Sequence, residues 1–176
     1  MTFTEHYLIP MIKNIKDQRF FNSERGYQGQ LVALLDRAIK DEKIFPDETI
    51  IEQEYQKTMK HHGIRQRPDI IIHIPIEAGL TDIRTENNFY VIALKLNAKV
   101  YSAIEDFGKL EDMFNQLDYP EGVFINIGAY PSLFLAEYGG QNQDRIHELS
   151  ISLDNNEVRI CHAKFENGEM VTKDDY

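Results

Sequence analysis

The sequence predicts an α/β or α+β sandwich, in which helices flank a mixed β-sheet. Two amphipathic helices are expected, because apolar residues recur at the helical period after Ser23 and after Ser102. Short apolar runs predict strands, most clearly at 89–98 and 123–128. The second helix lies between these two strands, and its short connections imply a right-handed crossover between parallel strands.

The composition is ordinary for a globular protein. The 176 residues include 42% hydrophobic and 27% charged residues. We therefore expect a single domain over residues 1–176, with a core at about 23–127 and a C-terminal β-meander at about 146–172. Cys161 is the only cysteine, so an internal disulfide is excluded. The sequence shows neither a membrane-spanning run nor a signal peptide, so we expect a cytoplasmic protein with no membrane partner.

Helices are expected to precede a β-hairpin in the N-terminal part of the chain. The first helix is predicted at 4–18, and Ser23 is a suitable N-cap for the second. Strands are then expected at 49–59 and 67–75, joined by a turn at Gly63.

The C-terminal half is expected to continue the sheet on the far side of the crossover helix. Ser102 and Glu105 form the S-x-x-E pattern of a capping box, which predicts that this helix starts at Ser102. Beyond the strand at 123–128, turn residues at 154–157 and 167–168 predict an antiparallel meander.

Two of the predicted strands carry a charged side chain among apolar neighbours. Asp69 lies at the head of the strand at 67–75, and Lys95 shares a face with Val91 and Ala93 in the strand at 89–98. Burial of either charge without a partner would be costly. If the strands are neighbours, Asp69 and Lys95 meet, either as a plain ion pair at the sheet edge or as a functional site.

The "RPD" sequence that ends in Asp69, followed by an apolar strand that ends in Lys95, resembles the PD-(D/E)XK nuclease superfamily. The order of elements from Ser23 to Ile127 is also similar to that family. The resemblance implies a restriction-endonuclease-like fold and magnesium-dependent hydrolysis of phosphodiester bonds, most often in DNA. It also implies a homodimer or a larger assembly, because cutting both strands takes two sites.

The resemblance implies a role for each matched residue. Asp69 would be a catalytic residue and a magnesium ligand, and Leu94 would offer its backbone carbonyl to the metal. Lys95 would activate the attacking water or stabilise developing charge. Glu24 is the better match for the family's helix acid, with Gln30 as an alternative that the sequence does not exclude.

Ala93 departs from the family pattern, which has an acid two residues before the lysine. Alanine cannot bind a metal, so we expect the protein to be inactive as written. Three explanations stay open: deliberate replacement of the acid, natural loss of catalysis in a protein that keeps the fold for binding, or migration of the acid to another element. Candidates for a migrated acid are Glu24, Glu77, Glu86 and Glu105.

A basic segment precedes Asp69, although the formal net charge of the chain is −10. We interpret Lys57, Lys60, Arg65 and Arg67 as candidates for contacts with backbone phosphates; a solvated turn is the alternative. Two other functions stay open. One is a catalytically dead module of the same fold that binds nucleic acid or a protein, and the other is an acidic decoy that occupies a basic partner.

Overall fold

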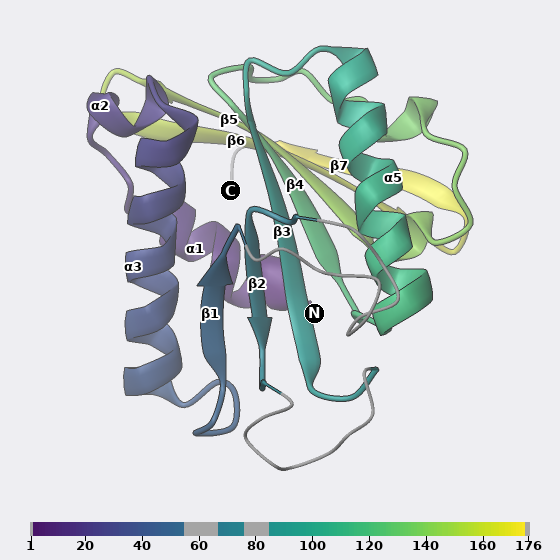
Figure 1. Cartoon of the computed structure of the whole chain (residues 1–176). Helices are drawn as coiled ribbons and strands as arrows, with labels where there is room; N and C mark the ends of the chain where they lie inside the picture. The colour runs from purple at the N-terminus through teal and green to yellow at the C-terminus, as the bar shows by residue number, and fades with distance from the viewer. Residues whose placement is uncertain (1, 55–66, 76–84, 175–176) are drawn as a thin grey trace.

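The computed structural model describes residues 2–54, 67–75 and 85–174, which form a mixed sheet of seven strands flanked by helices (Figure 1). The strands lie side by side in the order of the sequence. They are β1 (Ile50–Gln53), β2 (Ile70–His73), β3 (Asn88–Leu96), β4 (Gly122–Ile127), β5 (Ile146–Asp154), β6 (Glu157–Glu166) and β7 (Glu169–Asp174).

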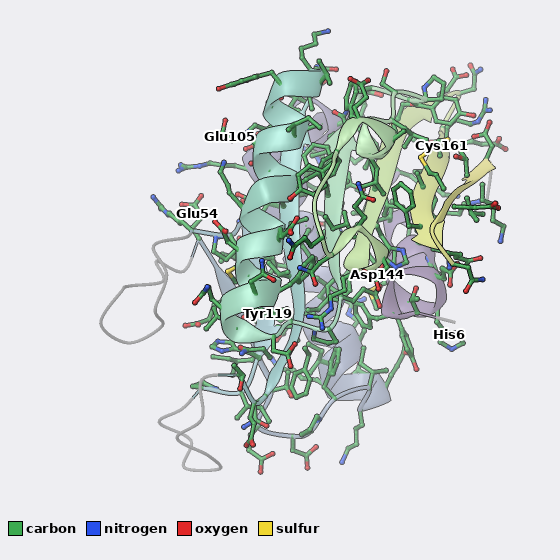
Figure 2. The ribbon with its side chains drawn as sticks, turned by 90° about the vertical axis from the view of Figure 1, so that its right-hand side faces the viewer. His6, Glu54, Glu105, Tyr119, Asp144 and Cys161 are labelled. Carbon is green, nitrogen blue, oxygen red and sulfur yellow. The ribbon has the colours of Figure 1, made fainter. Side chains whose placement is uncertain are left out.

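Helices cover both faces of this sheet, as the sequence predicts. A π-helical turn η1 (Thr4–Leu8), α1 (Ile9–Ile12), α2 (Gln18–Phe21) and α3 (Glu24–Glu42) share one apolar core with the sheet. The long helix α5 (Val100–Leu117) packs on the opposite face, which is turned toward the viewer in Figure 2. Two 3₁₀ turns, η3 (Leu135–Glu137) and η4 (Gln143–Arg145), lie between β4 and β5.

The pairing of the strands confirms the predicted hairpin, crossover and meander. β1, β2 and β3 pair antiparallel, whereas β3 and β4 are parallel and are connected through α5. The predicted turn at Gly63 lies outside the described residues. β5, β6 and β7 form the antiparallel meander, and Asn155 and Asn156 turn the chain with φ of 49° and 65°. Positive φ at both central residues is the geometry of a type I′ hairpin turn.

Two predicted helix boundaries are wrong. The first helix does not run over 4–18: α1 ends at Ile12, and α2 starts separately after Asp17, whose carboxylate accepts a hydrogen bond from the Arg19 N–H at 3.0 Å. The start of α5 is three residues earlier than the capping-box pattern predicts, since that pattern makes Ser102 the N-cap. Lys99 is its N-cap, and Ser102 is the third helical residue, whose Oγ accepts a hydrogen bond from the Lys99 N–H at 3.2 Å.

The predicted N-cap of α3 is confirmed. The Ser23 Oγ caps α3 by accepting a hydrogen bond from the Gly26 N–H at 3.1 Å. No helix in the described part of the chain is long and apolar enough to cross a membrane.

Candidate functional site

Asp69 lies immediately before β2, and hydrogen bonds to its carboxylate and to its backbone carbonyl fix its position. Its Oδ2 accepts a bond from the Leu94 N–H at 2.7 Å, and its own carbonyl accepts one from Gln28 Nε2 at 2.7 Å. The antiparallel register pairs Ile70 with Ile92, which brings Asp69 beside Ala93 on β3. The carboxylate is therefore anchored to β3, and the backbone carbonyl of the same residue is anchored to α3.

Asp69 and Lys95 line a common cavity of about 210 Å³, as expected from the strand pattern. We call it the β2–β3–α5 cavity, after the elements that surround it. Its polar lining comes from Arg67, Asp69, Lys95, Asp106 and Lys109, and Ala93 forms part of its wall. Ala93 is only 7% exposed, so a larger side chain there would project into the cavity rather than into solvent.

The ion pair that Lys95 forms within the described residues is with Asp106 of α5, not with Asp69. The Lys95 Nζ lies 3.8 Å from Asp106 Oδ2, and Lys109 Nζ lies 2.8 Å from the other carboxylate oxygen, Oδ1. The alternative that Asp69 and Lys95 form a simple ion pair is therefore wrong. The two strand charges meet in the cavity, and the helix supplies the counter-charge of the lysine.

Asp106 is a site residue that the sequence reasoning missed. Its side chain is 7% exposed, and it lies on the same side of α5 as the buried residues Ala103, Phe107 and Leu110. A signal for it does exist in the sequence. An acid at spacings of three and four from apolar residues lies on the buried stripe of a helix, where a carboxylate needs a partner or a ligand.

The electrostatic environment of Asp69 disfavours its charge. Burial raises the pKa of this carboxyl from 3.8 to about 6, although the hydrogen bond from the Leu94 N–H opposes the shift. The negative charges of Glu24 and Asp106 raise the pKa further, and Lys95 partly offsets them. Two carboxylates from separate helices, α3 and α5, thus act on the Asp69 carboxyl group.

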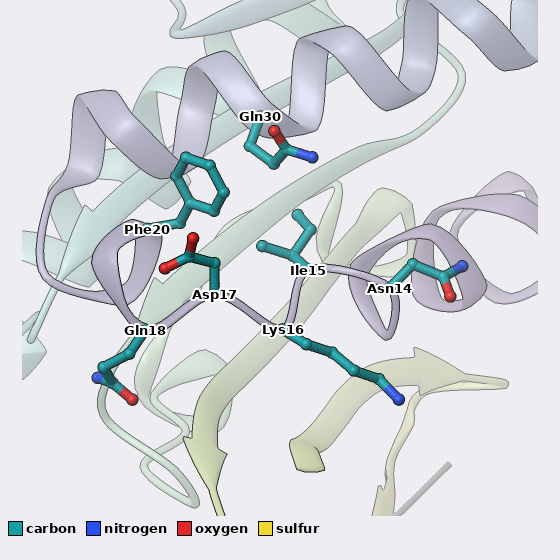
Figure 3. Close-up of a pocket in the computed structure, with 7 residues that line it drawn as sticks. All are labelled: Asn14, Ile15, Lys16, Asp17, Gln18, Phe20 and Gln30. Carbon is teal, nitrogen blue, oxygen red and sulfur yellow. The ribbon is translucent and has the colours of Figure 1, made fainter. Parts of the chain in front are cut away.

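Glu24, rather than Gln30, lies at the site. The Glu24 Oε2 accepts a hydrogen bond from the Leu96 N–H at 3.1 Å, and Glu24 lines an open pocket of about 290 Å³ together with Asp69. Gln30 lines a different pocket, formed with residues 14–17 of the α1–α2 connection and with Gln18 and Phe20 of α2 (Figure 3).

The basic segment is described only at its C-terminal end. Arg67 lines both pockets that contain Asp69, and its guanidinium donates hydrogen bonds to the carbonyl of Glu54 at 3.1 Å and to the Glu54 carboxylate. Lys57, Lys60 and Arg65 lie outside the described residues, so their contacts with phosphates stay a prediction.

Two other candidates for a migrated acid, Glu105 and Glu86, do not line the cavity. Glu105 is exposed on α5 (Figure 2) and lies 3.1 Å from Lys109 Nζ. Glu86 precedes β3, nine residues before Lys95, which corresponds to roughly 30 Å along a strand. Glu77 lies outside the described residues. Glu24 remains near Asp69, and Asp106 joins it as a candidate.

The fit of magnesium to these residues depends on two carboxylates. No group of three or more His, Cys, Asp or Glu side chains within the described ranges could hold a metal ion. Asp69 and Asp106 both line the cavity, and Asp106 Oδ2 is buried without a hydrogen-bond partner. Magnesium is commonly held by one or two carboxylates, with water and substrate phosphate completing its shell. The pair therefore fits such an ion, and the role of the Leu94 carbonyl stays a prediction.

Comparisons with models of protein families, with curated proteins and with solved structures gave no match to this chain.

Proposed function

We propose that this chain has a restriction-endonuclease-like fold and a phosphodiesterase site that acts on DNA with magnesium. The observation that carries the proposal is the β2–β3–α5 cavity. Asp69 from the head of β2 and Lys95 from β3 line it together, and Ala93 stands where the PD-(D/E)XK pattern has its second acid. A homodimer belongs to the proposal, because cutting both DNA strands requires two sites.

The side chains of the cavity suit a phosphodiester group. Lys95 is 38% exposed, so its ammonium can reach a phosphate oxygen and offset the charge that develops there. Lys109 and Arg67 add positive charge at the same cavity. Asp69 would be a ligand of the magnesium ion, which when bound lowers the pKa of a water molecule and neutralises phosphate charge.

Ala93 weakens this site because it removes one strong metal ligand. We therefore propose that the protein, as its sequence stands, hydrolyses DNA poorly or not at all. A glutamate at position 93 would project into the cavity beside Asp69, where its carboxylate could join the magnesium ligands.

A second function is favoured by the charge of the same cavity. Three cationic side chains, Arg67, Lys95 and Lys109, face two carboxylates, Asp69 and Asp106. The lining alone therefore carries one cation more than acids, although Glu54 and Glu105 outside it also pair with Arg67 and Lys109, and an acid at position 93 would remove this excess. A nuclease-fold module that binds backbone phosphate without cleavage is the alternative proposal.

The two functions are separated by the Ala93→Glu variant. We expect this variant to convert supercoiled plasmid to nicked and linear DNA, with magnesium or manganese, at least about tenfold faster than the wild type. The Ala93→Gln variant is the matched control, because its side chain has the same size but no charge, and it should stay inactive.

An inert Ala93→Glu variant would contradict the nuclease proposal. In that case, salt-sensitive binding of duplex DNA by the wild type, measured by fluorescence anisotropy and weakened by Lys95→Met, would support the binding module. If the wild type binds no DNA at low salt, the binding module fails as well.

A further inference from the structure

We propose that Asp106 of α5 supplies the carboxylate that position 93 lacks, so that Asp69 and Asp106 together bind a divalent cation in the β2–β3–α5 cavity. This inference rests on the proposed function, since it names the residue that completes the same site. In this arrangement the second acid comes from the crossover helix, whereas the family pattern places it on β3.

The first observation is an unused carboxylate oxygen. Asp106 is 5% exposed and lines the cavity, and its buried Oδ2 makes no hydrogen bond. Lys109 occupies only the other oxygen, Oδ1, and the Lys95 ammonium at 3.8 Å is beyond hydrogen-bonding distance of Oδ2. A buried charged oxygen without a hydrogen bond is costly, and a bound cation would remove that cost.

The second observation is that Asp106 is held firmly in place. The next residue, Phe107, is fully buried and packs edge-on against Phe124 of β4, with ring centroids 5.2 Å apart. Asp69 is equally fixed by its bond from the Leu94 N–H. The two carboxylates therefore face one cavity from rigid elements on opposite sides, which is the preorganisation that a metal site requires.

The third observation is the small side chain between them. Ala93 lines the cavity together with Asp69 and Asp106, so the cavity volume next to the two carboxylates is left free. Lys95, which is 38% exposed, can turn toward a phosphate when a cation takes its place beside Asp106 Oδ2. Lys95 then keeps the role that the family resemblance implies, whereas the second acid comes from α5 instead of β3.

The test is direct binding of Mn²⁺ to the full chain by isothermal titration calorimetry, with Mg²⁺ as a competitor. We expect Asp106→Asn and Asp69→Asn each to weaken Mn²⁺ binding by at least about tenfold, because loss of even an outer-shell partner costs that much. Glu105→Gln is the matched control. It removes the neighbouring acid of the same helix, which also pairs with Lys109 but is exposed, and it should leave binding unchanged.

A rescue variant guards against a simple folding defect. Adding Ala93→Glu to Asp106→Asn should restore Mn²⁺ binding, since it returns an acid to the cavity from β3. Wild-type affinity in Asp106→Asn, or no Mn²⁺ binding by the wild type while Ala93→Glu binds it, would overturn the inference. If only the Ala93→Glu variant binds Mn²⁺, the inference about Asp106 fails but the nuclease proposal survives. The nuclease proposal fails if Ala93→Glu binds Mn²⁺ and cleaves no DNA.

Discussion

Glu148 on β5 shows how a buried carboxylate outside the cavity is stabilised. Glu148 is fully buried, and its carboxylate accepts hydrogen bonds from the backbone N–H groups of Phe134 at 2.8 Å and of Leu135 at 2.7 Å. Burial raises the pKa of Glu148 from 4.5 to about 7, and these backbone bonds oppose the shift. The carboxyl group thus fixes the loop before η3 at the cost of an unfavourable charge.

This shift predicts a pH dependence of stability. Between pH 4.5 and about 7, the folded protein holds the Glu148 proton more tightly than the unfolded chain does, so the free energy of unfolding falls as pH rises. Glu148→Gln keeps a hydrogen-bond acceptor but cannot ionise. We expect the stability of this variant relative to the wild type to increase by up to about 3 kcal/mol from pH 4.5 to pH 8, measured by urea unfolding. A difference that does not change with pH would contradict the assignment.

Apart from Glu24, which the family resemblance indicated, the site residues that were predictable from the sequence are those whose charge interrupts a strand pattern. Asp69 and Lys95 stand out because strand residues alternate between faces, so each charge is visibly out of place among apolar neighbours. Asp106 does not stand out in this way, because a helix of 18 residues normally carries many acids on its exposed side. Its importance depends on the rotation of α5 about its axis, which the packing of Phe107 and Leu110 determines.

At the scale of elements, the seating of α5 on the sheet depends on a glycine. A Cβ at Gly122, the first residue of β4, would lie 2.9 Å from Val91 Cγ1 and 3.0 Å from Phe114 Cζ. These distances are too short for carbon atoms. Gly122 therefore lets α5 approach β3 and β4 closely, which places Asp106 at the cavity.

We predict that Gly122→Ala destabilises the protein by about 1–3 kcal/mol, because the added methyl group overpacks the interface below α5. Gly108→Ala on α5 is the matched control, since a Cβ added there would meet nothing within 4 Å and alanine favours a helix by roughly 0.5–1 kcal/mol. Opposite shifts of the urea midpoint are expected for the two variants. Equal shifts would mean that α5 is not seated through Gly122.

Periodicity predicted the long elements well and the short ones poorly. The helices α3 and α5 and the strand β3 carry patterns long enough to identify. The break after α1 was missed because Leu8, Ile12 and Ile15 keep helical spacing and are all buried. Ile15 reaches the core from a connecting segment, so its burial gives no sign that the helix has already ended.

At the scale of the whole molecule, the parallel pairing of β4 with β5 could not be derived from local patterns. The register joins Gly122 to Ile146 and Ile127 to Ile151 after a connection of irregular structure and short 3₁₀ turns. β4 is buried along its entire length because both neighbours are parallel and helices cover both faces. Its apolar sequence agrees with that position but does not say which strand lies on its far side.

Polar contacts between residues that are far apart in the sequence also join the N-terminal segment to this sheet. The Thr4 N–H donates to Glu121 Oε1 at 3.0 Å, and Lys164 Nζ lies 2.7 Å from Glu5 Oε1. These contacts hold η1 against the sheet on the face opposite α5. The sheet that carries the cavity is therefore connected by polar contacts to the first helical turn, η1, as far along as β6.

The most direct test of the nuclease site is whether cleavage gained by Ala93→Glu depends on the partners that the cavity brings together. We predict that Asp69→Asn and Lys95→Met, each added to Ala93→Glu, abolish magnesium-dependent plasmid cleavage while the folded state persists by circular dichroism. Cleavage that survives either second change, or an Ala93→Glu variant that never cleaves, would contradict a phosphodiesterase site built from these residues.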